Sequence, residues 1–269
     1  MTANQWMKTP KGYVAVSMVF FLLIASIWSQ DISGIYNGLI AVGVSSAADM
    51  ICSRIAKRKR MLPDGAVITG LIIALILGTT SPWYMVAGTS IIAILSKHLL
   101  VYKKKPIFNP AAFGLLLSIL FFRSGQSWWG AFGDLPTWSV VFLLIGGYMV
   151  TNRVNKFPQV FSFLGTYFIL LLIMGILNVG DATDALRSPF INASLFFALF
   201  MLTDPPTSPA KVKDQVIFGI LSAVVGAVIY GIFGGLMYLF IGLLVGNLYH
   251  ILVPKFRNAA IIKPVSQSR

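Results

Sequence analysis

The stretch FFALFMLTDPPTSPAKVKDQ, residues 196–215, ends an apolar run in a rigid turn and then becomes basic. Its three prolines, at positions 205, 206 and 209, stop a helix because proline lacks a backbone N–H. A helix that stops leaves its last carbonyl groups without intrahelical partners, and hydroxyl side chains can occupy freed backbone groups. The stretch therefore predicts a helix that ends near Asp204 in a polar site. The alternative is a plain solvent-exposed turn.

The composition around this stretch indicates a membrane protein. Hydrophobic residues make up 57% of the chain and charged residues 11%, and the mean hydropathy is +0.82. A soluble fold of 269 residues could not bury that much apolar surface. The net charge of +13 lies between apolar runs, which is typical of membrane topology and argues against a nucleic-acid partner. The single cysteine, Cys52, excludes an intrachain disulfide and a paired-cysteine metal site.

Ten apolar runs are long enough, or nearly long enough, to cross a bilayer. The two shortest are expected to be tilted, broken or re-entrant. The runs are 13–29, 35–53, 62–80, 83–101, 107–122, 138–151, 158–178, 189–203, 215–232 and 235–253, and the two short ones are 138–151 and 189–203.

The basic residues support ten helices with both termini in the cytoplasm. With that topology 19 of the 21 lysines and arginines fall inside, and Arg123 and Arg187 fall outside. Adding or removing one middle helix would reverse every later loop and abolish this asymmetry. We therefore expect a multi-pass protein of a bacterial cytoplasmic (inner) membrane. Its parts are a cytoplasmic tail (1–12), a first five-helix unit (13–122), an external loop (123–137), a second five-helix unit (138–253) and a basic cytoplasmic tail (254–269).

The third and eighth runs resemble each other. Residues 70–82 (GLIIALILGTTSP) align with residues 194–206 (SLFFALFMLTDPP), and Leu, Ala, Leu, Thr and Pro coincide at matching offsets. The two runs would cross the membrane in opposite directions, which is typical of an inverted repeat with a site at its interface. The sequence thus predicts an all-α membrane protein with a five-plus-five inverted repeat. Similar composition of any two apolar helices is the alternative explanation.

Four segments together resemble a known family. They are PDGAVITGLIIALIL (63–77), KHLLVYKKKPIFNPAAFG (97–114), LLIGGYMVTNRVNKFPQ (143–159) and FMLTDPPTSPAKVKDQVIFG (200–219). In this order they are similar to NqrB and RnfD, membrane subunits of the sodium-pumping quinone reductase and of the Rnf ferredoxin–NAD complex. The likeness covers about residues 60–260.

This resemblance implies a fold, a cofactor and partners. The fold would be an inverted repeat of ten helices related in shape to urea channels, and the function would be flavin-mediated electron transfer coupled to ion movement. The cofactor would be a flavin, FMN or riboflavin, and a quinone is compatible. Membrane lipid and other electron-transfer subunits, flavoproteins or iron–sulfur proteins, would be the partners.

One departure from the family concerns flavin attachment. Members carry an S-G-A-T-type motif in the external loop, where a threonine takes a phosphoester-linked FMN. The loop here, FRSGQSWWGAFGDLPTWSVV (122–141), lacks the motif, and its one threonine is Thr137. We therefore expect any flavin to be bound non-covalently.

The candidate cofactor-binding residues cluster at helix ends. Each also has a structural explanation: an acidic residue favours a helix N-terminus, a histidine suits the membrane edge, and asparagine before proline caps a helix. In functional terms, carboxylates and amides could hold a cation or the polar edge of a flavin, and a cationic pair could stabilise a reduced flavin. The candidates are Asp64, Gly65, Thr69, Lys97, His98, Asn109, Thr203, Asp204 and Thr207.

Two of these groups are expected to share one site. Asp64 starts the third helix and Asp204 ends the eighth, both on the cytoplasmic side. Two nearby carboxylates in a low dielectric require a proton, a cation or a donor between them, and Lys97 is the nearest candidate by topology. The tryptophans Trp128, Trp129 and Trp138 are expected to form an aromatic belt at the external surface.

Two functions remain open at this stage. The first is an RnfD/NqrB-like redox subunit, which would need partners for the chemistry because the chain has no nucleotide-binding motif. The second is a non-redox transporter or channel for flavin or another small planar solute. Whether the chain takes part in an enzyme depends on that choice.

Overall fold

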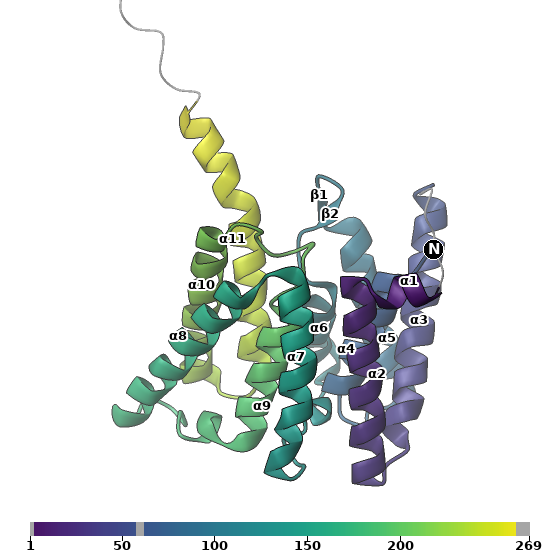
Figure 1. Ribbon diagram of the computed structural model, residues 1–269, viewed down its shortest axis with the longest axis horizontal. Coiled ribbons are helices and arrows are strands. Elements are labelled where there is room, and N and C mark those ends of the chain that lie inside the picture. The colour runs from purple at the N-terminus through teal and green to yellow at the C-terminus, as the bar shows by residue number, and fades with distance from the viewer. Residues whose placement is uncertain (1–2, 58–61, 262–269) are drawn as a thin grey trace, which may run out of the picture.

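The computed structural model describes residues 3–57 and 62–261, and side chains within residues 5–57 and 62–252. Figure 1 shows a bundle of helices, and the strands among the described residues are the two short ones of a single hairpin. The described part of the chain confirms the expected all-α class. Its helices are α1 (Ala3–Met7), α2 (Pro10–Ser29), α3 (Ser33–Ile55), α4 (Asp64–Ile76), α5 (Trp83–Leu99), α6 (Pro110–Phe122), α7 (Val140–Val154), α8 (Phe157–Ile176), α9 (Ser188–Phe196), α10 (Val212–Phe233) and α11 (Met237–Ile261).

Each of the ten apolar runs corresponds to one of the helices α2–α11 within the described residues. Four of these helices, α2, α3, α8 and α10, are long and apolar enough to cross a membrane alone. The third run was expected to stay helical to residue 80, but α4 ends at Ile76. At about 1.5 Å per residue, its 13 residues span about 20 Å, less than the roughly 30 Å of a bilayer core. Short helices such as α4 and α6 must therefore be completed by other segments.

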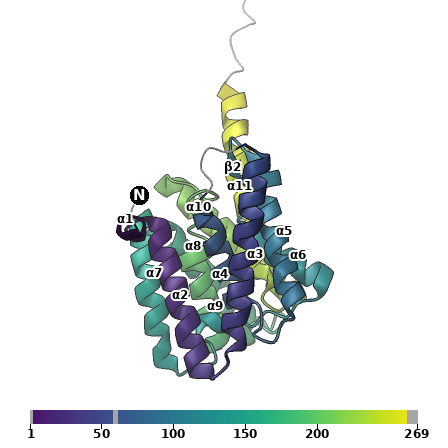
Figure 2. The same ribbon diagram turned by 90° about the vertical axis from the view of Figure 1, so that its right-hand side faces the viewer.

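The connections alternate between two faces of the bundle. Figure 1 places α1, the hairpin of β1 (Val101–Tyr102) and β2 (Lys105–Pro106), and the α9–α10 connection at one end. We call this end the terminal face, because the first described residues and the end of α11 also lie there, as Figure 2 confirms from the side. The basic residues of the described loops gather at this face. The opposite face holds Arg123 and Arg187.

Three helix contacts of the first half recur five helices later. In the first half α3 packs against α5, α5 against α6 and α2 against α4. In the second half α8 packs against α10, α10 against α11, and α7 against α9. The two halves meet where α2 contacts α7 and where α6 contacts α11, so each of these helices contacts its own counterpart.

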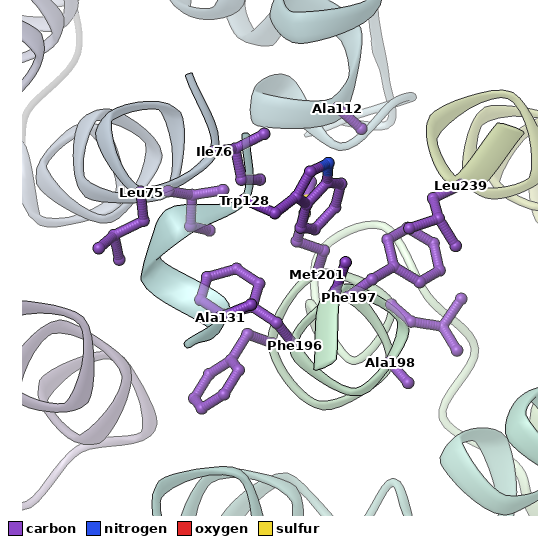
Figure 3. Packing of buried hydrophobic residues seen from close by; sticks show 14 of the residues in the cluster. Leu75, Ile76, Ala112, Trp128, Ala131, Phe196, Phe197, Ala198, Met201 and Leu239 are labelled. Carbon is purple, nitrogen blue, oxygen red and sulfur yellow. The ribbon is translucent and has the colours of Figure 1, made fainter. Parts of the chain in front are cut away.

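A buried aromatic cluster fills the centre of the bundle (Figure 3). Trp128 is 2% exposed, and its ring stacks on Phe240 of α11 at 5.5 Å and meets Phe196 of α9 edge-on at 6.1 Å. The expected belt of three tryptophans is therefore wrong for Trp128, which enters the core with the loop after α6. Trp129 also turns inward, and its indole N–H donates to Ala74 O at 2.8 Å. Only Trp138 fits the belt, because it is exposed and packs on Trp28.

The inward loop completes the short helix α4. Backbone N–H groups of Ser127 and Trp128 both donate to Ile76 O, at 3.0 and 3.1 Å. Beyond the helix end, the amide of Asn37 on α3 donates to Thr79 O at 2.9 Å. The carbonyl groups that α4 leaves without intrahelical partners are thus satisfied inside the protein, as a membrane environment requires.

Candidate functional site

The helix that ends at the Pro-rich turn changes its geometry before it stops. α9 is regular to Phe196, and the next five residues, Phe197–Met201, form the π-helix η4. Such wide turns are rare and are found mostly at functional sites. Thr203 bonds back to Leu199 O at 2.8 Å, and the two prolines after Asp204 prevent further helix. The sequence expectation of a helix end near Asp204 is confirmed.

Side chains from other helices satisfy the carbonyl groups that this helix end exposes. Asn109, at the start of α6, donates to Met201 O at 3.2 Å, and Gln159, on α8, donates to Leu202 O at 2.6 Å. Asn247, on α11, donates to Thr207 O at 3.0 Å, and the ammonium of Lys156 donates to Pro209 O. The turn is therefore packed against the bundle through Thr203, Thr207 and Ser208, which are buried, while Pro205 and Pro206 at its tip are exposed.

Asn109 has the capping role that the sequence predicted and also bonds across the bundle. Its side-chain oxygen caps α6 by accepting from Ala112 N at 3.1 Å, while its amide N–H group bonds the π-helix. Its own backbone N–H donates to the side-chain oxygen of Asn247 at 2.9 Å. Asn109 thus links α6, α11 and η4, and both polar ends of its side chain are used internally.

Asp204 lies inside this turn. Its carboxylate accepts from the Thr207 hydroxyl at 2.8 Å, and its backbone carbonyl accepts from Ser208 at 2.7 Å. Burial raises the pKa of the Asp204 carboxyl, while the Thr207 hydroxyl and the ammonium groups of Lys11, Lys156 and Lys97 act against that rise. The same burial lowers the pKa of Lys156 to about 8, and the Asp204 charge opposes that shift.

The start of α4 faces the same region. Asp64 accepts from the Lys11 ammonium at 3.2 Å, and the Thr69 hydroxyl bonds to Gly65 O at 2.9 Å. A Cβ atom at Gly65 would lie 3.4 Å from the Lys97 ammonium nitrogen, so the glycine leaves room for that lysine. Lys11, the ion-pair partner of Asp64, and Lys97 both favour the charged form of Asp204.

Lys97 does not bridge Asp64 and Asp204 as expected. Its ammonium bonds instead to Asp49 of α3 at 2.8 Å, and His98 contacts the same carboxylate oxygen at 2.7 Å. Sequence reasoning missed Asp49 because it lies within an apolar run that was interpreted only as a membrane helix. An acidic residue in such a run is rare and is itself a signal of function. Lys156, Gln159 and Asn247 were missed for the same reason, although each is an isolated polar residue at the edge of or inside an apolar helix.

Together these residues form a charged cluster near the terminal face. It contains three carboxylates and three ammonium groups, and the His98 ring joins it through Asp49. The ion pairs of Lys11 with Asp64 and of Lys97 with Asp49 reduce the cost of placing these charges in a low dielectric. We define the charged cluster as Lys11, Asp49, Asp64, Lys97, His98, Lys156 and Asp204.

The arrangement does not offer a ready flavin pocket. The polar side chains expected to meet the ring edge, those of Asn109, Thr203 and Thr207, all hold intramolecular bonds. Two cavities among the described residues lie elsewhere. One of about 390 Å³ lies between α2 and α7, and one of about 380 Å³ lies beside residues 78–82 at the opposite face. A flavin site at the charged cluster is therefore not supported by its donors.

Short and interrupted helices around buried charges define a class of multi-pass, all-α membrane proteins. Comparison with known sequences gives the family: the chain matches the NQR2, RnfD, RnfE family over residues 4–137 and 123–260 and belongs to it. It is also 31% identical over 111 residues to the RnfD component of the ion-translocating oxidoreductase complex of Aeromonas salmonicida (strain A449). That match covers 40% of this chain and 32% of the relative, so the chain matches about a third of the relative's length.

Proposed function

We propose that the protein is a membrane subunit of an ion-translocating oxidoreductase complex, in which it takes part in flavin-mediated electron transfer across the membrane. Family membership and the name of the similar Aeromonas protein support this assignment. The observation that carries it is the charged cluster at the end of the interrupted helix α9–η4. Asp49, Lys97 and His98 of this cluster lie within the helices α3 and α5, and ionisable residues inside membrane helices are costly and are characteristic of ion and proton pathways.

The proposed fold is an inverted repeat that places this cluster beside the repeat interface. The recurring helix contacts support it, and so does a matched pair of amides. In the first half Asn37, early in α3, donates to a carbonyl beyond the end of α4. In the second half Gln159, early in α8, donates to a carbonyl beyond the end of η4. The two carbonyl groups belong to Thr79 and Leu202, and the sequence alignment pairs Thr79 with Thr203, the residue after Leu202.

In the proposed function, the charged cluster would serve ion translocation. Asp204 shares its surroundings with Lys11, Lys97 and Lys156, so a change in its protonation alters the electrostatics of the α4 start as well. A cation or proton that reaches Asp204 would neutralise its charge and leave the lysines in excess. Coupling of this kind does not need a relay of carboxylates across the membrane. The chain, with eight aspartates and no Glu, would not provide such a relay.

The flavin in this proposal is bound without a covalent link. Thr137 lies at the start of a 3₁₀ turn (Thr137–Ser139) on the opposite face and is exposed, but its sequence context lacks the attachment motif. Because the donors at the charged cluster are already used, contact with a flavin is expected where this chain meets another subunit of the complex. Flavoprotein or iron–sulfur subunits are the expected partners.

Purification from native membranes tests the assignment. A chain with an affinity tag at either end would be extracted in a mild detergent, and the bound proteins and the visible spectrum would be recorded. We expect flavoprotein or iron–sulfur subunits to co-purify and a flavin band that acid precipitation releases. The chain alone, without other subunits and without any chromophore, would contradict the redox assignment.

The second candidate is a non-redox transporter for flavin or another small planar solute. The external loop without the attachment motif favours it, because a chain that never holds FMN covalently has no need of that motif. Uptake of riboflavin by vesicles that contain only this protein, with no partner subunits, would establish this function instead.

Both proposals place the protein in the bacterial inner membrane with its termini in the cytoplasm. The described basic residues at the terminal face support that orientation, because cytoplasmic loops carry the excess of lysine and arginine. The terminal face would then be the cytoplasmic face, and the charged cluster would be reached from the cytoplasm.

A further inference from the structure

A groove on the membrane-facing surface runs between α2 and α7. It has a volume of about 390 Å³, and its walls are almost entirely apolar. Val16 and Phe20 of α2 form one wall and Ile145 and Met149 of α7 the other, and all four side chains are exposed. Figure 1 shows α2 and α7 side by side at the front of the bundle, and Figure 2 shows them along one side of it. The groove is therefore open to lipid.

The groove exists because α7 has a glycine where it approaches α2. A Cβ atom at Gly146 would lie only 2.9 Å from the ring of Phe21 and 3.3 Å from the Ser17 hydroxyl oxygen. Phe20 and Phe142 meet edge-on at 5.8 Å across the two helices, at the end of the groove away from the terminal face. The helix rises about 10 Å from Tyr13 to Phe20, which sets the length of the groove.

The mouth of the groove is positively charged. Lys8 lines it at the terminal face, and Arg153 stands beside it with its guanidinium over the Tyr13 ring at 5.8 Å. Arg153 donates one N–H to the backbone carbonyl of Lys8 at 2.9 Å, which fixes the two cations at the same place. Among the described residues no carboxylate pairs with either side chain, and no groove-lining residue is acidic.

We propose that this groove is a specific site for an anionic phospholipid, with one acyl chain between α2 and α7 and its phosphate at Lys8 and Arg153. An apolar channel with charge at one end fits an amphiphile in one orientation only. Positive charge at the mouth selects an anionic headgroup over a zwitterionic one, because basic residues near the membrane surface attract anionic lipid. Since α2 and α7 belong to different halves of the bundle, the lipid would join the two halves on their outer surface.

Lipid retention measured by native mass spectrometry tests this site. Protein would be equilibrated with phosphatidylglycerol or phosphatidylcholine of identical acyl chains in mixed micelles, and the retained lipids would be counted. We expect one phosphatidylglycerol to be retained more strongly than phosphatidylcholine. Lys8→Gln should weaken that retention about fivefold, and Lys8→Gln with Arg153→Gln further. The single variant keeps the bond to Arg153, because that bond uses the Lys8 backbone carbonyl.

A second pair of variants tests the chain-binding part of the groove. Val16→Trp places a large ring between the walls and should abolish retention of phosphatidylglycerol. Val19→Trp is the control, since Val19 is also exposed on α2 but does not line the groove. Lys103→Gln controls for the loss of one positive charge at the same face.

Two results would overturn the proposal. One is equal retention of both lipids, unchanged in Lys8→Gln and Val16→Trp, which would mean non-specific contact with the bundle surface. The other is displacement of phosphatidylglycerol by a neutral long-chain quinone in a manner independent of Lys8 and Arg153, which would assign the groove to a neutral ligand.

Discussion

Lys156 is buried in the connection between α7 and α8, with 4% of its surface exposed. A lysine in that position loses hydration, and two features compensate it: its bond to Pro209 O and the nearby charge of Asp204. Burial outweighs the Asp204 charge, so the pKa of Lys156 falls to about 8. The protonation of Lys156, which contacts the turn at 203–209, therefore depends on the pH at the terminal face.

The low pKa of Lys156 predicts a pH-dependent stability. Between the folded pKa of about 8 and the ordinary value of 10.5, the unfolded chain binds more protons at this group than the folded one. Its contribution to the free energy of unfolding should therefore rise with pH across that window, by at most about 1.4 kcal/mol per pH unit. Thermal unfolding in a mild detergent should show this rise in the wild type relative to Lys156→Met.

Lys211→Met is the control, because Lys211 is exposed in a neighbouring connection. The same pH profile in the wild type and in Lys156→Met would show that this lysine keeps an ordinary pKa. A contribution that falls as the pH rises from 8 to 10 would contradict the predicted sign.

At the scale of the element, the apolar runs predicted the ten helices because hydropathy alone decides which segments lie in lipid. It did not predict where α4 stops, because residues 77–80 remain apolar or small, while the inward loop bonds to Ile76 O and Asn37 bonds to Thr79 O. Trp128 was misplaced for a related reason: a tryptophan in a loop is typical of the interface, and only packing against Phe240 reveals that the loop enters the core. The Asp64 and Asp204 helix ends were predictable, because prolines and isolated carboxylates mark them. Asp49 and Lys156 were not, because their role depends on partners far away in sequence.

The paired amides give a prediction for the two interrupted helix ends. Asn37→Leu and Gln159→Leu each remove an amide that satisfies a carbonyl at such an end. Each should lower the free energy of unfolding by about 1–3 kcal/mol, the cost of a buried polar group without a partner. Thermal unfolding in detergent measures the effect, with Phe161→Leu, at an exposed position of α8, as the control. Destabilisation by Gln159→Leu alone would argue that the two ends are not equivalent.

At the scale of the whole molecule, both ends of the described chain lie at the terminal face, as an even number of crossings would require. Reporters inserted near Lys104 and fused after Arg269 should both read as cytoplasmic. A reporter at Gly125 should read as external, and Gly125 suits the insertion because it is exposed, whereas Gly130 packs against Leu75. A cytoplasmic signal at Gly125 would contradict the ten-helix topology and with it the inverted repeat.

The absence of the attachment motif predicts that no flavin is linked covalently. Denatured protein on a gel should show no flavin fluorescence under ultraviolet light. A fluorescent band that Thr137→Ala abolishes would show that the loop at 122–141 accepts FMN in an unfamiliar sequence context.

The charged cluster at the end of α9–η4 is proposed to serve ion-coupled electron transfer, and this role is the central claim. The most direct test compares wild type and Asp204→Asn in membrane vesicles that contain the whole complex, by measuring electron-transfer rate, ion uptake and folded yield together. Asp134→Asn, at an exposed position of the opposite face, is the control. We predict that Asp204→Asn reduces ion uptake per electron at least tenfold, while folded yield changes little. A tenfold reduction corresponds to the loss of a charge-assisted contact of about 1.4 kcal/mol. Unchanged ion uptake and electron transfer in Asp204→Asn would contradict the account and reduce the turn to a helix stop.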